Sequence, residues 1–254
     1  MNPNPRQIRL LEEVRVRASM SIDALSRLLD VTPQTVRRDV SALVDAGLLM
    51  RFHGGVAAPN STVQNIAYLQ RQELNAEGKR HIARTVAREV PNGCSMIINI
   101  GTTTEEVARA LRHHHDLSVV TNNLNVAAIL AENERCEVIV AGGIVRPRDR
   151  GIVGEATVDF IRQFRVDIGL IGISSIEPDG TLRDFDYREV RVAQAIIEHS
   201  RELWLVADRT KFGRRAMVQL AHLAQVNVLF TDAPPPEAVL RTLADSGGRC
   251  VVAD

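Results

Sequence analysis

From Glu77 onwards, short apolar segments of strand length alternate with longer segments of helical period. The predicted strands are Ser95–Ile100, Leu117–Thr121, Glu137–Ala141, Val166–Ile173, Glu202–Ala207, Asn227–Thr231 and Arg249–Val252. The predicted helices are Glu77–Val90, Glu105–Arg112, Asn125–Asn133, Ala156–Gln163, Asp186–Ser200 and Pro236–Ser246. This alternation predicts an α/β domain, in which helices cover both faces of a mostly parallel sheet. Ligands of such sheets bind beyond the carboxyl ends of the strands.

The first 58 residues follow a different pattern, of short helices and a hairpin. Apolar residues at helical spacing predict a first helix over Arg6–Arg17, and Ser21 is a suitable N-cap for a second. A tight turn then leads to Thr32, which caps a third helix with Pro33 at its first position. Two glycines between apolar stretches predict a β-hairpin over Leu48–Ala58. Together these elements predict a winged helix-turn-helix.

The third predicted helix has one apolar face and one polar face. Val36, Val40, Leu43 and Val44 form the apolar stripe. The opposite face offers Arg for guanine, Gln for adenine and the methyl group of Thr for thymine, so it suits the major groove of DNA. We expect Arg37, at the edge of the stripe, and the hairpin residues to contact phosphates. The predicted DNA-binding residues are Thr32, Gln34, Thr35, Arg37, Arg38, Ser41, Arg51 and His53.

Charge and composition bear on the class of partner. The formal net charge is zero, but residues 1–58 hold eight Arg and six acidic residues, so this part is mildly basic. Aromatic residues make up only 4% of the chain, which argues against stacking on single-stranded nucleic acid. An Arg-rich bundle of short helices could also be a protein-interaction module, and this alternative remains open.

The cysteines and the apolar runs indicate the compartment. Cys94, Cys136 and Cys250 are far apart and form no C-x-x-C pair, which argues against a disulfide framework or a zinc knuckle. The sequence has no apolar run of membrane-spanning length and does not begin with a segment of signal-peptide type. We therefore expect a cytoplasmic protein made of residues 1–58, a linker over 59–75 and an α/β domain over 76–254.

Polar or glycine-containing loops follow several predicted strands. Gly101-Thr102-Thr103-Thr104 precedes a helix, and its hydroxyl and N–H groups could hold a small phosphate. The alternative is an ordinary capped helix start. The other loops of this kind contain Thr121 and Asn122, Gly142 and Gly143 followed by Arg146, and Asp208 with Lys211. Lys211 is one of only two lysines, the other being Lys79. Because carboxyl ends of parallel strands share one edge, these loops predict a single anion site.

Other constellations carry less information. Asp184, Asp186 and Glu189 could act as acid or base groups, but Asp186 could equally cap a helix, with Glu189 in the capping-box position. The run His113-His114-His115 is read as a solvated helix end rather than a metal site. The sequence contains neither G-x-x-x-x-G-K-[ST] nor G-x-G-x-x-G. We therefore predict no cofactor, no metal and no catalytic residue.

Specific motifs resemble a known family. The head carries PQTVRRD (Pro33–Asp39) and RFHGG (Arg51–Gly55), and resembles DeoR-type bacterial transcription regulators. Similar stretches of the body are NIGTT (Asn99–Thr103), VTNNLNVA (Val120–Ala127), AGG (Ala141–Gly143), GIVGEATVDFI (Gly151–Ile161), QFRVD (Gln163–Asp167), FDYREVR (Phe185–Arg191), KFGRRAMV (Lys211–Val218) and TDAPPP (Thr231–Pro236). FDYREVR and TDAPPP indicate one subgroup. The resemblance covers nearly the whole chain.

The resemblance implies a repressor whose α/β domain is similar to sugar-phosphate isomerases but binds rather than turns over its ligand. For the subgroup it implies sn-glycerol 3-phosphate as inducer and glycerol catabolism genes as targets. Carried over by position, the inducer-binding residues are Gly101, Thr102, Thr103, Thr121, Asn122, Gly142, Gly143, Asp186, Glu189 and Lys211. The reasoning from the residues themselves adds Arg146, and the family position before the Gly-Thr-Thr loop adds Asn99. Asn99 stands where the family usually has Asp, so one negative charge near the anion is absent.

Two functions are therefore compared. The first is a repressor that binds double-stranded operator DNA as a homo-dimer or homo-tetramer and leaves it when a small phosphorylated inducer binds. The second is a phosphosugar isomerase-like enzyme with an appended helix-turn-helix. The helix-turn-helix and the extent of the resemblance favour the first.

Overall fold

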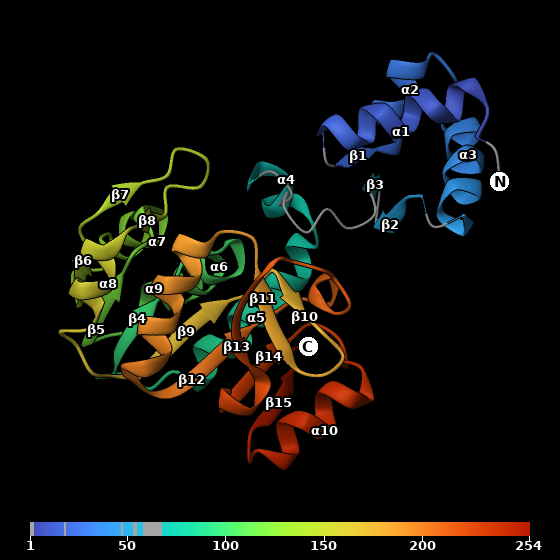
Figure 1. The fold of residues 1–254 in the computed structure, drawn as a ribbon. Coiled ribbons are helices and arrows are strands. Elements are labelled where there is room, and N and C mark those ends of the chain that lie inside the picture. Colours follow the sequence, from blue (N-terminus) through green and yellow to red (C-terminus); the bar gives the residue numbers. More distant parts are fainter. Residues whose placement is uncertain (1–2, 18, 47, 53–54, 58–67) are drawn as a thin grey trace. The chain divides into compact units, whose positions relative to one another are not determined.

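The computed structural model describes residues 3–17, 19–46, 48–52, 55–57 and 68–254. His53 and Gly54 of the predicted hairpin lie outside them. The chain forms two compact units, Met1–Gln70 and Arg71–Asp254 (Figure 1). The short helix α4 (Tyr68–Glu73) falls within the segment that the sequence analysis assigned to a linker. In the described residues, no helix is both long and apolar enough to cross a membrane.

The N-terminal unit contains the predicted three helices and hairpin. The helices are α1 (Pro5–Arg17), α2 (Ile22–Leu29) and α3 (Pro33–Asp45). Strands β2 (Met50–Phe52) and β3 (Gly55–Ala57) pair antiparallel, and β1 (Ser19–Ser21), which was not predicted, adds a third strand beside β3. Asp30, in the turn between α2 and α3, has a left-handed φ of 51°, a conformation that Asp tolerates better than most residues.

The C-terminal unit is built on a seven-stranded sheet in the order β15-β14-β12-β9-β4-β5-β6. All six neighbouring pairs are parallel, as predicted. The strands are β4 (Ser95–Ile98), β5 (Leu117–Thr121), β6 (Cys136–Val140), β9 (Val166–Gly172), β12 (Ser200–Val206), β14 (Val228–Thr231) and β15 (Arg249–Val252).

Helices cover both faces of this sheet (Figure 1). One face packs against α5 (Ala76–Glu89), α6 (Thr102–Ala110) and α7 (Leu124–Leu130). The other face packs against α8 (Glu155–Ile161), α9 (Tyr187–Glu198) and α10 (Glu237–Asp245). Adjacent residues of β4 serve opposite faces, because Ile97 belongs to one apolar cluster and Met96 and Ile98 to the other. The predicted α/β class is therefore confirmed.

The order of the strands places a switch point between β4 and β9. From β4 the chain continues outward through β5 and β6, and it then returns to β9 on the other side of β4. Crevices at such points, beyond the carboxyl ends of the strands, are where open α/β sheets bind ligands. The site predicted from sequence follows β4, so it begins at this crevice.

Two smaller sheets were not predicted. The hairpin of β7 (Ile144–Val145) and β8 (Ile152–Val153) follows β6. The second is an antiparallel sheet of β10 (Ser175–Ile176), β11 (Thr181–Asp184) and β13 (Val218–His222). Both carry polar residues of the candidate site, since Arg146 lies between β7 and β8 and Asp184 ends β11.

Candidate functional site

Helix α3 presents the two faces that its sequence predicted. Val36, Val40 and Leu43 are fully buried in the core of the N-terminal unit. Gln34 and Arg38 are exposed, as is Arg37. The hydroxyl of Thr32 accepts a hydrogen bond from the N–H of Thr35 at 3.3 Å, so the predicted cap exists. The start of α3 is thus held in shape while its outer side chains remain available to a partner.

The hairpin residue Arg51 is tied to α3. Its guanidinium nitrogen Nη2 donates to the Ser41 hydroxyl at 2.6 Å, and that hydroxyl donates to the carbonyl of Arg37 at 2.9 Å. These two hydrogen bonds link the Arg51 side chain to the main chain of Arg37 through Ser41. Both arginines are predicted to contact phosphates. His53 lies outside the described residues.

Asp39 is a buried carboxylate on α3 that the sequence analysis did not single out. It is 4% exposed and accepts from Arg6 Nε at 2.6 Å and from Gln7 Nε2 at 3.2 Å. These bonds join α3 to α1 and compensate for the burial of a charge. Its position between Val36, Val40 and Leu43 at helical spacing was the signal that it faces inward.

At the switch point of the sheet, α6 begins with three backbone N–H groups that have no partner within the helix. Gly101 is its N-cap and makes no side-chain cap, and the first N–H bonded back into the helix is that of Glu105. The N–H groups of the first turn therefore remain to bind an anion at the positive end of the helix dipole. Thr102 and Thr103 are 8% and 5% exposed at this turn.

The predicted residues after β5 are held by internal bonds. The Thr121 hydroxyl donates to the carbonyl of Ile98 at 2.7 Å, which ties β5 to β4. The Asn122 side chain donates to the carbonyl of Ile152 at 3.0 Å, while its Oδ1 has no hydrogen-bond partner. Asn99, at 2% exposure, likewise has an unpartnered Oδ1. The two unpartnered oxygens leave acceptors at the ends of β4 and β5.

Of the two glycines after β6, Gly143 has a packing role. A Cβ at Gly143 would lie 2.2 Å from the Thr157 hydroxyl, so only glycine fits there. Thr157 in turn donates to the carbonyl of Gly142 at 2.8 Å. Both glycines are exposed on the described surface, and the close approach of α8 explains Gly143 without a ligand, whereas a Cβ at Gly142 would meet no atom within 4 Å.

Arg146, in the β7–β8 connection, gathers three carboxylates. Its guanidinium lies 2.7 Å from Asp149, 3.0 Å from Asp186 and 2.8 Å from Glu189. Asp186 also caps α9 through the N–H of Arg188 at 3.0 Å, whereas Glu189 pairs with Arg146. Burial, assisted by Asp184, raises the pKa of Glu189 above its ordinary value, although Arg146 opposes the shift. The cluster offers charged groups of both signs that could orient ligand hydroxyls.

Lys211 is buried beside Asp208 rather than lying in a solvated loop. The short helix η2 (Arg209–Lys211) places its ammonium 3.9 Å from the Asp208 carboxylate, and the two residues are 8% and 0% exposed. Burial lowers the pKa of Lys211, with Asp208 opposing and Arg214 adding to the decrease. Burial also lowers the pKa of Lys79, on α5, to about 8, and the charge of Lys211 adds to that decrease. The chain's only two lysines therefore lie near each other, inside the protein.

Two arginines of this site were missed by the sequence analysis. Arg71 lies near Lys79, Lys211 and Glu189, since its charge acts on the pKa of all three. Arg214 stacks over the Phe185 ring at 5.0 Å, and burial lowers its pKa to about 10. Arg71 precedes the predicted sheet and no motif marked it, whereas Arg214 lies within the KFGRRAMV stretch, from which only Lys211 was selected. With Lys79 and Lys211, these arginines bring four cations to the crevice, where the buried carboxylates of Asp208, Asp184 and Asp149 offset part of their charge.

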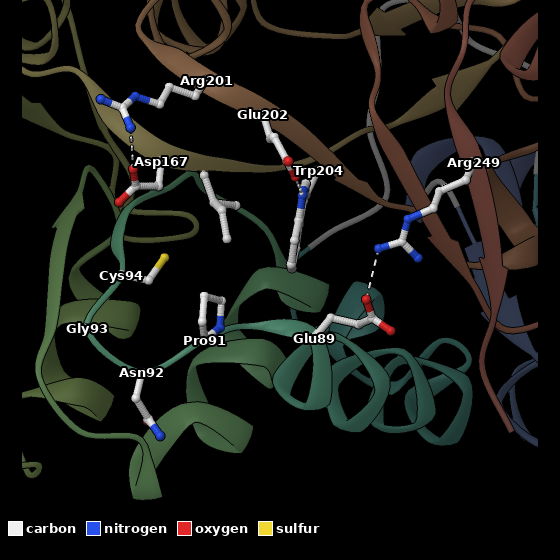
Figure 2. Close-up of a pocket in the computed structure, with 11 residues that line it drawn as sticks. Glu89, Pro91, Asn92, Gly93, Cys94, Asp167, Arg201, Glu202, Trp204 and Arg249 are labelled. Atoms are coloured by element: carbon white, nitrogen blue, oxygen red, sulfur yellow. Dashed lines mark hydrogen bonds and ion pairs between the residues drawn. The ribbon is translucent and has the colours of Figure 1, made fainter.

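A separate cavity of about 440 Å³ opens at the amino ends of the strands, at the opposite edge of the sheet (Figure 2). Its charged side chains satisfy one another, with Glu89 2.8 Å from Arg249 and Asp167 3.3 Å from Arg201. Burial raises the pKa of Cys94 in its wall to about 11, so the thiol stays protonated and is a poor nucleophile. The described residues contain no group of His, Cys, Asp and Glu suited to a metal ion.

Comparisons with known proteins agree with this division. Residues 6–62 match the DeoR-like helix-turn-helix domain, and residues 74–233 match the DeoR C terminal sensor domain. The glycerol-3-phosphate regulon repressor of Escherichia coli is 48% identical over 245 residues, which cover 96% of this chain and 97% of the relative. The protein of the same name from Haemophilus influenzae is 45% identical and covers 99% of this chain and 98% of its own length.

A third relative and one structure complete the comparison. The HTH-type transcriptional repressor CsqR of Escherichia coli is 44% identical, covering 96% of this chain and 93% of its own. Ribose 5-phosphate isomerase A from Neisseria gonorrhoeae covers 54% of this chain and 53% of its own, with a TM-score of 0.40 and 14% identity, too distant to bear on function. The three relatives are named as repressors, which favours a regulator over an enzyme. With both domain models matched and identities of 44–48% over nearly its full length, the chain belongs to the DeoR family of helix-turn-helix transcription regulators.

Proposed function

We propose that this protein represses genes of glycerol and glycerol 3-phosphate catabolism by binding their operator, and that sn-glycerol 3-phosphate releases it. The observation that carries the proposal is the cluster of buried cations at the start of α6: Lys79 donates to the same Arg71 carbonyl as Thr102, and Lys211 lies near Lys79. The names of the Escherichia coli and Haemophilus influenzae relatives support the choice of regulon.

The crevice suits a small phosphate because it combines charge with exclusion of water. Lys79 is 1% exposed, so an ion pair with it is screened far less than one at the surface. Burial disfavours the charged lysines, as their lowered pKa values show, and a dianion would offset that cost. In this proposal the first turn of α6, with Gly101, Thr102 and Thr103, and the two lysines hold the phosphate.

The Arg146 cluster would then recognise the rest of the inducer. Asp186 and Glu189 are acceptors for hydroxyl groups, and Arg146 is a donor that they already hold in place. A polyol phosphate such as glycerol 3-phosphate carries hydroxyls next to its phosphate and fits this arrangement. Asn99 and Asn122 add the unpartnered amide oxygens at the ends of β4 and β5.

Operator binding would use α3 and the hairpin. Gln34 and Arg38 face outward from the start of α3, so we assign them to base edges together with Thr35. We assign to the DNA phosphate backbone Thr32, Arg37, Ser41 and Arg51. His53 is assigned to the same backbone from the sequence alone. A protein that reads a palindromic operator in the cytoplasm would act as a homo-dimer or homo-tetramer.

The test is reciprocal coupling. Glycerol 3-phosphate should weaken operator binding by roughly 5- to 150-fold, corresponding to about 1–3 kcal/mol, and operator DNA should weaken inducer binding by the same factor. Isothermal titration of the full chain with and without operator measures both factors. Equal inducer affinity in the two titrations would refute release by this ligand. Parallel titrations with inorganic phosphate and other sugar phosphates test the identity of the inducer.

Lys211→Met tests the site itself. Loss of a charge-assisted contact of about 1.5–3 kcal/mol should lower inducer affinity tenfold or more, while operator binding stays intact. The variant should therefore remain on its operator when inducer is added. Arg215→Met removes an exposed cation four residues away and is the matched control. Release of the Lys211→Met variant at the wild-type inducer concentration would place Lys211 outside the site.

A further inference from the structure

Arg71 is the first residue of the C-terminal unit, so the chain enters this unit from the DNA-binding unit at Arg71. Its main-chain carbonyl accepts hydrogen bonds from the ammonium of Lys79 and, at 3.5 Å, from the hydroxyl of Thr102. Its guanidinium lies 3.4 Å from the carboxylate of Asp149. The start of the unit is thus fastened directly to residues of the proposed inducer site.

The donors in these contacts are the same ones that an incoming phosphate would need. Lys79 and Thr102 now donate to the carbonyl of Arg71, and the Arg71 guanidinium now donates to Asp149. A phosphate dianion is a stronger acceptor than a peptide carbonyl, because its charge adds Coulomb attraction to the Lys79 ammonium and makes the bond from the Thr102 hydroxyl charge-assisted. The phosphate and the Arg71 carbonyl therefore compete for Lys79 and Thr102.

We propose that this competition is the switch: an anion bound by Lys79 and Thr102 withdraws their bonds from the Arg71 carbonyl and so loosens the segment that leads to the DNA-binding unit. The inference rests on the proposed function and adds how the site is regulated. Helix α4 (Tyr68–Glu73), of which Arg71 is part, is the element whose attachment changes. Repression then requires the fastened state and induction the loosened one.

The surroundings of Lys79 explain why it can change partners. Four charged groups act on the pKa of Lys79. The cations Lys211 and Arg71 lower it, and the carboxylates of Asp208 and of Glu106 on α6 raise it. The Arg71 carbonyl is a neutral acceptor, so it leaves the buried ammonium of Lys79 without a full counter-charge. A dianion supplies that charge. The ligand therefore binds the loosened state more tightly than the fastened one, as an effector must if it is to shift the equilibrium.

Hydrogen exchange of the full chain tests the switch at the segment itself. In wild type, saturating glycerol 3-phosphate should speed exchange of the amides of residues 71–75, while amides of the central strands stay protected. Exchange that is unchanged or slower, at a ligand concentration that releases the operator, would overturn the switch but leave the proposed function standing.

The Lys79→Met variant tests the switch without any ligand. Its outcome therefore does not depend on whether glycerol 3-phosphate is the inducer. Met fills a similar volume without a donor, and the variant should show fast exchange at residues 71–75 and at least about threefold weaker operator binding, a part of the usual coupling range. Arg80→Met, an exposed neighbour on α5, should match wild type. Thermal melting checks that Lys79→Met is folded.

Arg71→Gln, which removes the contact with Asp149 but keeps the carbonyl bonds, should give a smaller effect of the same sign. Operator affinity and exchange in ligand-free Lys79→Met that equal those of Arg80→Met would refute the switch. A wild type that neither binds glycerol 3-phosphate nor leaves its operator would refute the proposed function, and the ligand-free comparison would still decide on the switch.

Discussion

The two units of the protein place the side chains proposed to bind their partners in opposite environments. In the N-terminal unit Gln34, Arg37 and Arg38 are exposed along one helix. In the C-terminal unit Lys79, Lys211 and Arg146 are 8% exposed or less. The difference follows from the partners proposed for each unit. DNA offers many phosphates, and surface charges bind it by releasing counterions. A small ligand offers one phosphate, so strong binding requires a site from which water is excluded.

The largest effect is expected from removing a buried carboxylate of the C-terminal unit. Asp208→Ala should cost about 3–5 kcal/mol at neutral pH, because it leaves Lys211 and Lys79 without their main counter-charge in a buried site. Denaturant unfolding monitored in the C-terminal unit measures the effect. Asp245→Ala, at an exposed position of α10, should stay within about 0.5 kcal/mol of wild type. A loss below 1 kcal/mol for Asp208→Ala would show that the buried charges are not interdependent.

Asp39 is the exception to the exposed pattern of the N-terminal unit. Asp39→Ala removes the acceptor of Arg6 and Gln7, and it should destabilise that unit by about 1.5–3 kcal/mol. Operator affinity should then fall by the same factor for every DNA sequence, since the variant affects folding and not base contacts. Asp45→Ala, exposed on the same helix, is the control. Altered base preference in Asp39→Ala would instead place this residue at the DNA surface.

Arg38→Ala should act on sequence preference and leave stability alone. A lost bidentate contact to guanine costs about 1–3 kcal/mol and relaxes one position of the operator. In contrast, Arg37→Ala should weaken binding to all sequences alike and reduce its salt dependence, as expected for a phosphate contact. Selection from a randomised operator library, run on both variants, separates the two. An unchanged base preference in Arg38→Ala would contradict the assignment.

Buried and exposed cations should also differ in their response to pH. The pKa of Lys79 is about 8, so Lys79 is charged at pH 7 and mostly neutral at pH 9. Inducer affinity should therefore fall about tenfold over that range, or ~1.4 kcal/mol, and the lowered pKa of Lys211 acts in the same direction. Operator binding relies on arginines, which stay charged. Titration calorimetry at pH 7, 8 and 9 measures the inducer, and a flat profile would exclude Lys79 from the site.

Much of the fold could be predicted from the sequence because its signals are local. Apolar periods marked all seven strands of the central sheet, and Ser21, Thr32 and Asp186 were identified from sequence as possible helix caps. The small strands β1, β7, β8, β10, β11 and β13 were missed. Most of them span only two or three residues, too few to show a period.

The polar edge of the sheet was predicted only in outline. The sequence pointed to Lys211 by its rarity and to the Gly101 loop by its place after a strand. It did not single out Arg71, which lies 30 residues before Gly101, or Arg214, which lies three residues after Lys211. Nor could it show that the Thr121 hydroxyl is bonded to a neighbouring strand, or that Gly143 makes room for Thr157.

The sequence by itself therefore determined the two units, the parallel sheet and the outward face of α3, because a helix or strand sets the direction of its own side chains. Only the tertiary structure decided which charges are buried together: Arg71 lies on α4, Lys79 on α5, and Asp208 and Lys211 at the turn after β12. Their electrostatic coupling depends on distance and on exclusion of water, and both arise only when the sheet brings the ends of its strands to one edge.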